Sequence, residues 1–415
     1  MRIGEVANPE RGQWGKPLEG LRILAAEQMQ ALPYATQLLS HLGAHVVKIE
    51  PPGRGETGRH SQPALEDADG RRVGATYLRN NLNKQSICLD LKSDEGRAIF
   101  RSLIPHFDVV AENFTPGTMA RFGLDYGALR DDHPEMIYVS ISGFGHLSNS
   151  PYRHWPAYAP AVEAMAGIYE PTRKEGEPPP VVVAGALGDN AAALFTTIGI
   201  LAALQHRART GLGQYVDVSM YDSTLALADM IPQLHSMGAP PEWATAGSFG
   251  IVAGFRASDG WFVISCLREH HFERLVETIG HPEWKDDPRF ATREGWAREI
   301  EPTLRPAIES WAHDKTRREA CEALATQGVA AGPSQLAQDI VDDPHVAMRN
   351  MLIEVPREDA DDDMLVVGNP VKLSRAAEGP VSAFPRLGEH TDEVLRDTLG
   401  LDETRIAELR ERGVI

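Results

Sequence analysis

The N-terminal half of the chain alternates short apolar runs with a segment of helical periodicity. The runs typical of buried strands are residues 21–26, 45–50, 86–92, 108–114 and 136–145. Between the first two runs a helix is expected from Pro33 to Leu42, with proline in its first turn and Gly43 after its end. A strand, a helix and a strand at this spacing predict a βαβ unit, and therefore an α/β fold with an open parallel sheet.

Open parallel sheets bind ligands beyond the carboxyl ends of their strands, so the loops after residues 108–114 and 136–145 are candidate sites. Two catalytic motifs in this half are incomplete. The segment 53–58 matches G-x-G-x-x-G, but polar loop rather than apolar helix follows it, and we reject a dinucleotide fingerprint. Ser142 lacks the glycine two residues earlier that a serine nucleophile elbow requires, because Ser140 stands there.

From Gly247 the pattern changes to two apolar strands joined by the turn at residues 258–260, and charged helices follow. The Ser-Asp-Gly turn predicts a hairpin. This region therefore predicts a second, smaller α+β domain of about a hundred residues. His270 and His271 are adjacent and point to different faces, so no metal site is expected there.

The segment from Val181 to Leu204 places an aspartate at a predicted strand–turn–helix junction. An apolar run at residues 181–183 breaks at Gly185 and Gly188, and Asp189 then precedes an Ala/Leu/Ile-rich segment that predicts a buried helix. Position alone favours an N-cap role for Asp189. The same geometry permits a covalent nucleophile, because no sequence neighbour carries a competing charge and a helix N-terminus favours the ionised carboxylate.

Composition limits the partners of the 415-residue chain. Its net charge of −18 at pH 7 argues against a nucleic-acid partner, so an anionic ligand must be met by a local basic pocket. Cys88, Cys266 and Cys321 form no disulfide or zinc motif, which indicates a reducing, cytoplasmic setting. The N-terminus lacks an apolar signal core, and the run from Ala191 to Leu204 is judged too short and too polar to span a bilayer. No membrane association is expected.

Several sequence blocks together are more specific than any of these motifs. They include PYATQLLSHLGAHVVKIEPPG, NKQSICLDLKSDEG, ENFTPGTMARFGL, AGALGDNAAALFTTIGILAALQHRARTGLGQYVDVSMYD and LGEHTDEVL. Through these blocks the chain resembles, from Pro17 to Ile415, the class III coenzyme A transferases, or CaiB/BaiF family, and among them the formyl-CoA transferases.

This resemblance implies an activity and an architecture. The activity is transfer of CoA from an acyl-CoA donor to a free carboxylic acid, with CoA as the substrate and without a metal. The architecture is a large Rossmann-like domain built from both chain ends, residues 1–225 and 336–415, the second stretch beginning with a linker. A linker at residues 226–245 leads to the small α+β domain at residues 246–335, and two chains form an interlocked homodimer.

The resemblance also assigns the site. Asp189 is the implied nucleophile, which forms an aspartyl anhydride and then an aspartyl-CoA thioester. Gln30 and Tyr158 are expected to join it, Gln30 by steadying the reacting carboxyl group. Lys92 and Arg121 are expected to meet the CoA phosphates. The implied CoA-binding residues are Gln30, Ala31, Leu89, Asp90, Leu91, Lys92, Asn113, Phe114, Thr115 and Arg121.

Two departures from the family pattern bear on ligand binding. The basic residue usual after the sequence KIE is replaced by Pro51, so Arg54 or Arg59 is expected to substitute. The glycine-rich active-site loop of formyl-CoA transferase has no counterpart after Gly247, which argues against formyl and oxalyl specificity. The sequence leaves open which acids are exchanged, and in which direction.

Two further departures keep alternatives open. The acid usual after Tyr158 is Ala159, which removes a support of the nucleophile, and the basic residue usual just before it is not matched at residues 155–156. One alternative is a 2-methylacyl-CoA racemase of the same fold, whose catalytic histidine falls at Tyr158. The other is a non-catalytic subunit of a heteromeric CoA-transferase, which Ala159 favours and Asp189 opposes.

Overall fold

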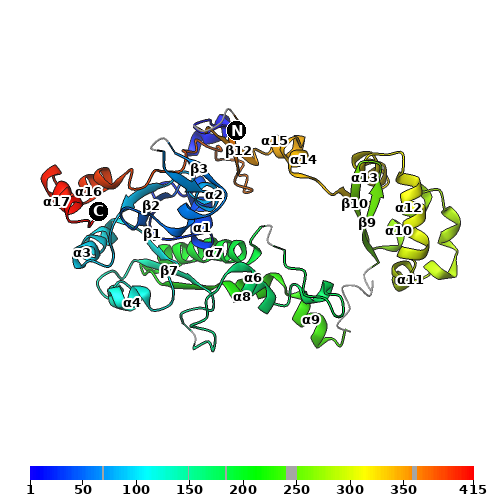
Figure 1. Ribbon diagram of the computed structural model, residues 1–415, viewed down its shortest axis with the longest axis horizontal. Helices are drawn as coiled ribbons and strands as arrows, with labels where there is room; N and C mark the ends of the chain where they lie inside the picture. The colour runs from blue at the N-terminus through cyan, green and yellow to red at the C-terminus, as the bar shows by residue number, and fades with distance from the viewer. Residues whose placement is uncertain (68–69, 148, 183–184, 240–249, 358–361) are drawn as a thin grey trace. The chain divides into compact units, whose positions relative to one another are not determined.

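The computed structural model describes residues 1–415 except 68–69, 148, 183–184, 240–249 and 358–361 (Figure 1). Contacts divide the chain into two units. The large unit contains Met1–Ala166, Val181–Asp229 and Pro344–Ile415, and the small unit contains Gly167–Pro180 and Met230–Asp343. Both chain ends thus lie in the large unit. The domain boundaries given above stay a prediction.

The large unit is organised around a six-stranded parallel sheet, as the apolar runs predicted. The strand order is β5-β2-β1-β6-β7-β8. This is the order of doubly wound nucleotide-binding folds, in which the chain first builds outward from β1 on one side and then returns to build on the other. The strands are β1 (Arg22–Ala26), β2 (His45–Glu50), β5 (Gln85–Cys88), β6 (Val109–Glu112), β7 (Ile137–Ser142) and β8 (Tyr215–Ser219).

Helices cover both faces of this sheet (Figure 1). The helices of the large unit are α1 (Ala31–His41), α2 (Ala75–Asn80), α3 (Asp94–Leu103), α4 (Thr118–Phe122), α5 (Tyr126–Leu129), α6 (Ala159–Met165), α7 (Leu187–Thr210), α8 (Met220–Leu227), α15 (Pro344–Met348), α16 (Thr391–Leu399) and α17 (Glu403–Glu411). Successive strand residues point to opposite faces. Ile23 and Ala25 pack with α1 and α7, whereas Leu24 packs with α3, α16 and α17.

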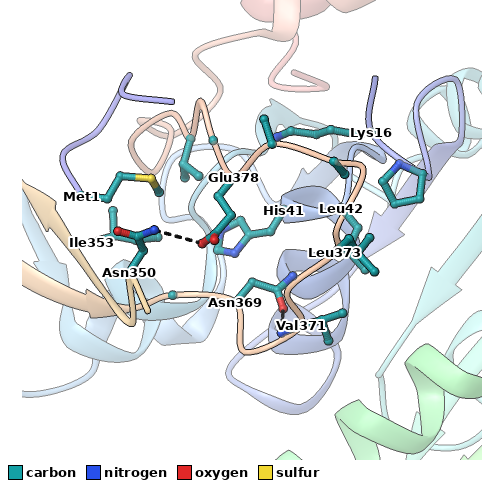
Figure 2. Close-up of a pocket in the computed structure, with 16 residues that line it drawn as sticks. Met1, Lys16, His41, Leu42, Asn350, Ile353, Asn369, Val371, Leu373 and Glu378 are labelled. Atoms are coloured by element: carbon teal, nitrogen blue, oxygen red, sulfur yellow. Dashed lines mark hydrogen bonds between the residues drawn. The ribbon is translucent and has the colours of Figure 1, made fainter. Parts of the chain in front are cut away.

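The N-terminus contacts the C-terminal part of the chain within the large unit. The amino group of Met1 donates to the Leu352 carbonyl at 3.3 Å, and the hairpin of β12 (Leu352–Val355) and β13 (Met364–Val367) follows. A second hairpin pairs β3 (Ala64–Glu66) with β4 (Arg72–Gly74). Figure 2 shows a cavity of about 40 Å³ between the terminal segments, across which Asn350 bonds Glu378 at 3.5 Å. It is a packing gap large enough for about one or two waters.

The small unit contains the predicted hairpin. Strands β9 (Ile251–Ala257) and β10 (Gly260–Cys266) are antiparallel, and β11 (Ala330–Pro333) adds a third strand. Their buried face packs on Trp296 and Phe272, which stack with ring centroids 4.6 Å apart. The helices of this unit are α9 (Met230–Ser236), α10 (Glu269–Thr278), α11 (Arg293–Arg298), α12 (Arg305–Ala312), α13 (Arg317–Thr326) and α14 (Ala337–Val341).

Helix α7 corrects one sequence argument. It has 24 residues and a mean hydropathy of 1.5 in its most apolar window, so by length and composition it could cross a membrane. The judgement that this run is too short and too polar was therefore wrong. Its small residues Ala191, Ala192 and Ala203 are buried in the core of the large unit, and the core helix of an α/β unit has the same composition.

A buried charge network lies at the carboxyl end of β1. Glu27 is 1% exposed, and its Oε1 accepts a hydrogen bond from the Lys84 Nζ at 2.7 Å. The Thr36 hydroxyl donates to its Oε2 at 2.7 Å, and the Lys48 Nζ lies 3.8 Å from Oε1. Because a buried charge is very costly without a partner, these groups depend on one another.

The network continues into the loop after β2. The Arg59 guanidinium grips both oxygens of Glu50 at 2.7 Å, and Glu56 accepts bonds from the Lys48 Nζ at 3.3 Å and from the Met29 amide at 3.0 Å. The segment with the incomplete G-x-G-x-x-G motif therefore connects the loop after β2 to the loop after β1. Arg59 is committed to Glu50.

We expect Glu27→Ala to lower the free energy of unfolding by about 3–5 kcal/mol, because it leaves Lys84 buried without its carboxylate. Urea titration measures this. The control is Asp131→Ala, which breaks an exposed pair 3.5 Å long with Arg130 and should cost less than about 1 kcal/mol. Equal costs for the two variants would contradict the expected role of the network.

Candidate active site

The strand order reverses between β1 and β6. The loops after these two strands therefore turn in opposite directions and leave a gap at this switch point. The side chain of Asn113, which follows β6, spans this gap. Its Oδ1 accepts from the Gln28 amide at 2.9 Å, and its Nδ2 donates to the Gln28 carbonyl at 2.9 Å. Asn113 therefore holds the two loops in register, and this is a structural role beside any contact with a ligand.

One cavity at this point contains Asp189 and has a volume of about 380 Å³; we call it the Asp189 cavity. Seven residues that the resemblance assigned line it: Gln30, Ala31, Asn113, Phe114, Thr115, Tyr158 and Asp189. They come from four separate segments of the large unit. The predicted catalytic set is thus brought together, with Tyr158 largely exposed at the cavity wall.

A second cavity, of about 600 Å³, lies beyond the ends of β2 and β5; we call it the Lys92 cavity. The predicted residues in its wall are Leu89, Asp90, Leu91, Lys92 and Phe114. Gln28, Thr57 and Phe114 line both cavities, so the two adjoin.

The structure places the three arginines that were candidates for ligand binding differently. Arg54 lines the Lys92 cavity, whereas Arg59 is bound to Glu50, so Arg54 is the one of the pair available to a ligand. Arg121 is exposed on α4 and donates to the Thr118 hydroxyl at 3.0 Å. Thr118 lines the cavity and Arg121 itself does not, so its contact with CoA stays a prediction.

Asp189 is not the N-cap of its helix. It is the third residue of α7, and the N-cap is Ala186, with φ of 41° and no capping side chain. The cap comes from the neighbouring helix α6, where Glu163 Oε1 accepts the Gly188 amide at 2.9 Å. The expected strand before this corner is also absent among the described residues, because Val181 and Val182 are exposed and outside any strand. Residue 183 lies outside the described chain.

The charge on Asp189 is set by its surroundings. Burial, and after it the charge of Glu163, raise the pKa of its carboxyl to about 6, while Arg79 acts in the opposite direction. The expectation of a carboxylate without a competing charge was therefore wrong, because it considered sequence neighbours alone. At neutral pH most of Asp189 is ionised, and the raised pKa makes it a better nucleophile than an ordinary aspartate.

Gln30 connects the residue after Asp189 to a cation. Its Nε2 donates to Asn190 Oδ1 at 2.9 Å, and its Oε1 accepts from the Arg79 guanidinium. Gln30 is 8% exposed, so both ends of its amide are satisfied inside the protein. The residue thus ties the loop after β1 to the first turn of α7, beside Asp189.

Sequence reasoning missed several residues of the site. Arg153, His154 and Trp155 line the Asp189 cavity from an irregular loop after β7. The basic position left unmatched at residues 155–156 was the only signal, and Arg153 supplies a cation just before it in the chain. Glu163 was also missed, although it stands one helical turn after Ala159 and brings an acid to the region that Ala159 lacks. Among the described residues, no group of three or more His, Cys, Asp or Glu is arranged to hold a metal.

The large unit is thus a doubly wound α/β fold with an aspartate and two adjoining cavities at its switch point. The sequence model of CoA-transferase family III matches residues 18–391. The chain therefore belongs to this family of enzymes.

Known relatives cover nearly the whole chain. It is 37% identical over 395 residues to succinyl-CoA:mesaconate CoA-transferase of Haloarcula marismortui, covering 93% of this chain and 97% of the relative. It is 34% identical over 426 residues to formyl-CoA:oxalate CoA-transferase of Streptomyces avermitilis, covering 96% and 100%. The crystal structure of a CaiB/BaiF family protein from Brucella suis has a TM-score of 0.80 and 31% identity, covering 92% and 99%. The resemblance given by the sequence blocks is confirmed.

We expect Glu163→Gln to lower the pKa of Asp189 by up to about one unit from its value near 6, because glutamine keeps an acceptor for the Gly188 amide and removes the charge. A ¹³C NMR titration of aspartate-labelled protein measures it. The matched control is Glu170→Gln, which alters an exposed pair with Arg173 and should leave the Asp189 titration unchanged. An unchanged titration in the Glu163 variant would contradict the assigned cause.

Proposed function

We propose that the enzyme transfers CoA from an acyl-CoA donor to a free carboxylic acid, with Asp189 as the covalent carrier. The observation that carries the proposal is that Asp189, with a pKa near 6, lies in a cavity that adjoins the larger Lys92 cavity. Two adjoining cavities suit acyl-CoA, because its phosphates and its thioester lie at opposite ends of one long molecule. Membership of the family supports the reaction class.

The Lys92 cavity fits the nucleotide end of CoA. Lys92 and Arg54 supply positive charge there, which the chain's net charge of −18 makes necessary for a polyanionic ligand. Leu89 and Leu91 add apolar surface to the same wall. The pantetheine arm then passes Phe114, which lines both cavities, and brings the thioester to Asp189.

In the first half-reaction the Asp189 carboxylate attacks the thioester carbonyl. The C–S bond breaks, leaving an aspartyl acyl anhydride and CoA thiolate. The thiolate then attacks the aspartyl carbonyl, which releases the donor acid as its carboxylate and leaves an aspartyl-CoA thioester. One oxygen of Asp189 departs with the donor acid.

The second half-reaction runs these steps in reverse with the acceptor. Its carboxylate attacks the aspartyl-CoA thioester, CoA thiolate leaves, and a new anhydride forms. The thiolate attacks the acceptor carbonyl, so the acceptor leaves as a thioester and Asp189 regains a carboxylate with one acceptor oxygen. The free energy of the thioester is retained throughout. Gln30 and Glu163 hold the first turn of α7, and so the nucleophile, in place during both halves.

The relatives suggest which donors to try first. Their names include succinyl, mesaconate, formyl and oxalate groups. Succinyl-CoA is the first donor that we propose, because the sequence argued against formyl and oxalyl specificity. The residues around Gly247 on which that argument rests lie partly outside the described chain.

We further propose a cytoplasmic homodimer, interlocked as the resemblance implies. Helix α7 leaves Leu194, Ile198 and Leu201 exposed at 45%, 59% and 38%, a spacing of four and three residues that forms one stripe. An apolar stripe of this kind on the large unit supports a protein–protein contact, and the family supports a second copy as its occupant.

One specific observation favours the alternative function, a 2-methylacyl-CoA racemase. His154 lines the same cavity as Asp189, so the site holds a second group able to move protons. A racemase would exchange the α-proton of a 2-methylacyl-CoA in deuterated water without any acceptor acid. Such exchange in the wild type, retained in part by Asp189→Asn, would favour this reading.

We expect a CoA-sized adduct on the Asp189 peptide after incubation with succinyl-CoA, and hydroxylamine should trap it as a hydroxamate. Peptide mass spectrometry measures both. Asp189→Ala should form no adduct and lose at least about 10³-fold in turnover. CoA binding without any adduct in the wild type would contradict the proposal, and activity that appears only with a second, related chain would indicate a non-catalytic subunit.

We expect Ile198→Glu combined with Leu194→Glu to weaken the dimer, because two buried charges would face each other across the apolar stripe. Sedimentation velocity should show a dimer for the wild type and mainly monomer for this variant. The control is Met348→Glu, at an exposed apolar position on α15. A wild-type monomer, or an unaffected dimer in the double variant, would contradict the assignment of this stripe.

A further inference from the structure

Arg153 stands between two cavities at the switch point. It lines the Asp189 cavity and also a neighbouring cavity of about 260 Å³, which we call the Tyr126 cavity. Arg153 is half-buried. Within the part of the chain that the structure describes, its guanidinium forms no ion pair and no hydrogen bond, so its five donors are available to a ligand.

The turn that carries Arg153 is held in place. Tyr152 packs on Phe144 and on Trp155, with ring centroids 5.5 and 4.8 Å away. The Arg153 amide donates to the Ser150 carbonyl at 3.1 Å, and the Trp155 amide donates to the Tyr152 carbonyl at 2.8 Å. The base of the side chain is therefore fixed at the cavity wall, which lowers the entropy that ligand binding would cost.

The surrounding charges leave Arg153 free for an anion. Glu163 and Arg79 are the charged groups that shift the pKa of Asp189, and Arg153 is not among them. In the Tyr126 cavity, burial raises the pKa of Glu112 to about 7, and that carboxyl is already bonded to Ser140 and to the Phe114 amide. Glu112 is thus a weak competitor for Arg153. Asp125, the other acid in this wall, lies outside ion-pair distance of it.

We propose that Arg153 is a specificity-determining residue, which binds the distal carboxylate of a dicarboxylic acyl group while the proximal carboxyl reacts at Asp189. The proposal rests on the proposed CoA-transferase reaction. A planar guanidinium grips a carboxylate through two parallel hydrogen bonds, and in a strongly acidic chain such a group is needed to hold a dianionic acid at all. The enzyme therefore prefers diacids to monoacids of equal length.

The test compares succinyl-CoA with butyryl-CoA, which has the same number of acyl carbons and no distal carboxylate. Wild type should prefer succinyl-CoA. Arg153→Gln should lower kcat/KM for succinyl-CoA by roughly 10- to 100-fold, mainly through KM, and change that for butyryl-CoA less than about 2-fold. Arg153→Lys keeps the charge and should retain part of the preference. Arg130→Gln, at an exposed position paired with Asp131, is the matched control and should behave as wild type.

The outcomes separate this proposal from the one on which it rests. Equal losses for both donors in Arg153→Gln, or a wild type that does not prefer succinyl-CoA, would overturn the role of Arg153 while transferase activity stands. Butyryl-CoA turnover in the variant verifies that it is folded. If no donor gives an Asp189 adduct in the wild type, the transferase proposal itself fails.

Discussion

The buried charge network at the carboxyl ends of β1 and β2 is the constraint on which the site depends. It joins the carboxylates of Glu27, Glu50 and Glu56 to the cations of Lys48, Lys84 and Arg59, all at most 5% exposed. Such a cluster is costly to bury and contributes little net stability, but removal of one member is strongly destabilising because it leaves a buried charge without its partner. Through the Met29 amide and the Thr57 hydroxyl, which donates to Gln28 at 3.2 Å, it fixes the wall shared by the two cavities.

The nucleophile depends on a second buried acid. Glu163 caps α7 and at the same time raises the pKa of Asp189, so one side chain both orients and activates the carboxylate. A pKa near 6 is a compromise, because a lower value would give a weaker nucleophile and a higher one would leave less of the ionised form at neutral pH. Arg79, bound to Gln30, keeps the shift moderate. In this chain Glu163 thus brings an acid to the region where the family pattern expects one at Ala159.

The sequence predicted the sheet well because buried parallel strands have a clear apolar pattern, and each of the five runs overlaps a strand of the observed sheet. It predicted the local setting of Asp189 poorly, because the cap comes from Glu163, 25 residues earlier in the chain, and no local pattern encodes that contact. The choice between Arg54 and Arg59 likewise depended on which one Glu50 binds. Arg153 lies in a loop without periodicity, so its place in the cavity wall could only come from the three-dimensional structure.

The central claim, that Asp189 is the covalent carrier of CoA, is tested most directly by oxygen transfer in a single turnover. Enzyme preloaded with CoA from a donor is mixed with an acceptor acid labelled with ¹⁸O in both carboxylate oxygens, and the Asp189 peptide is weighed by mass spectrometry. The mechanism predicts one ¹⁸O atom in the Asp189 carboxylate after the single turnover, because the bridging oxygen of the second anhydride stays on the enzyme. Product formation without label at Asp189 would contradict the account.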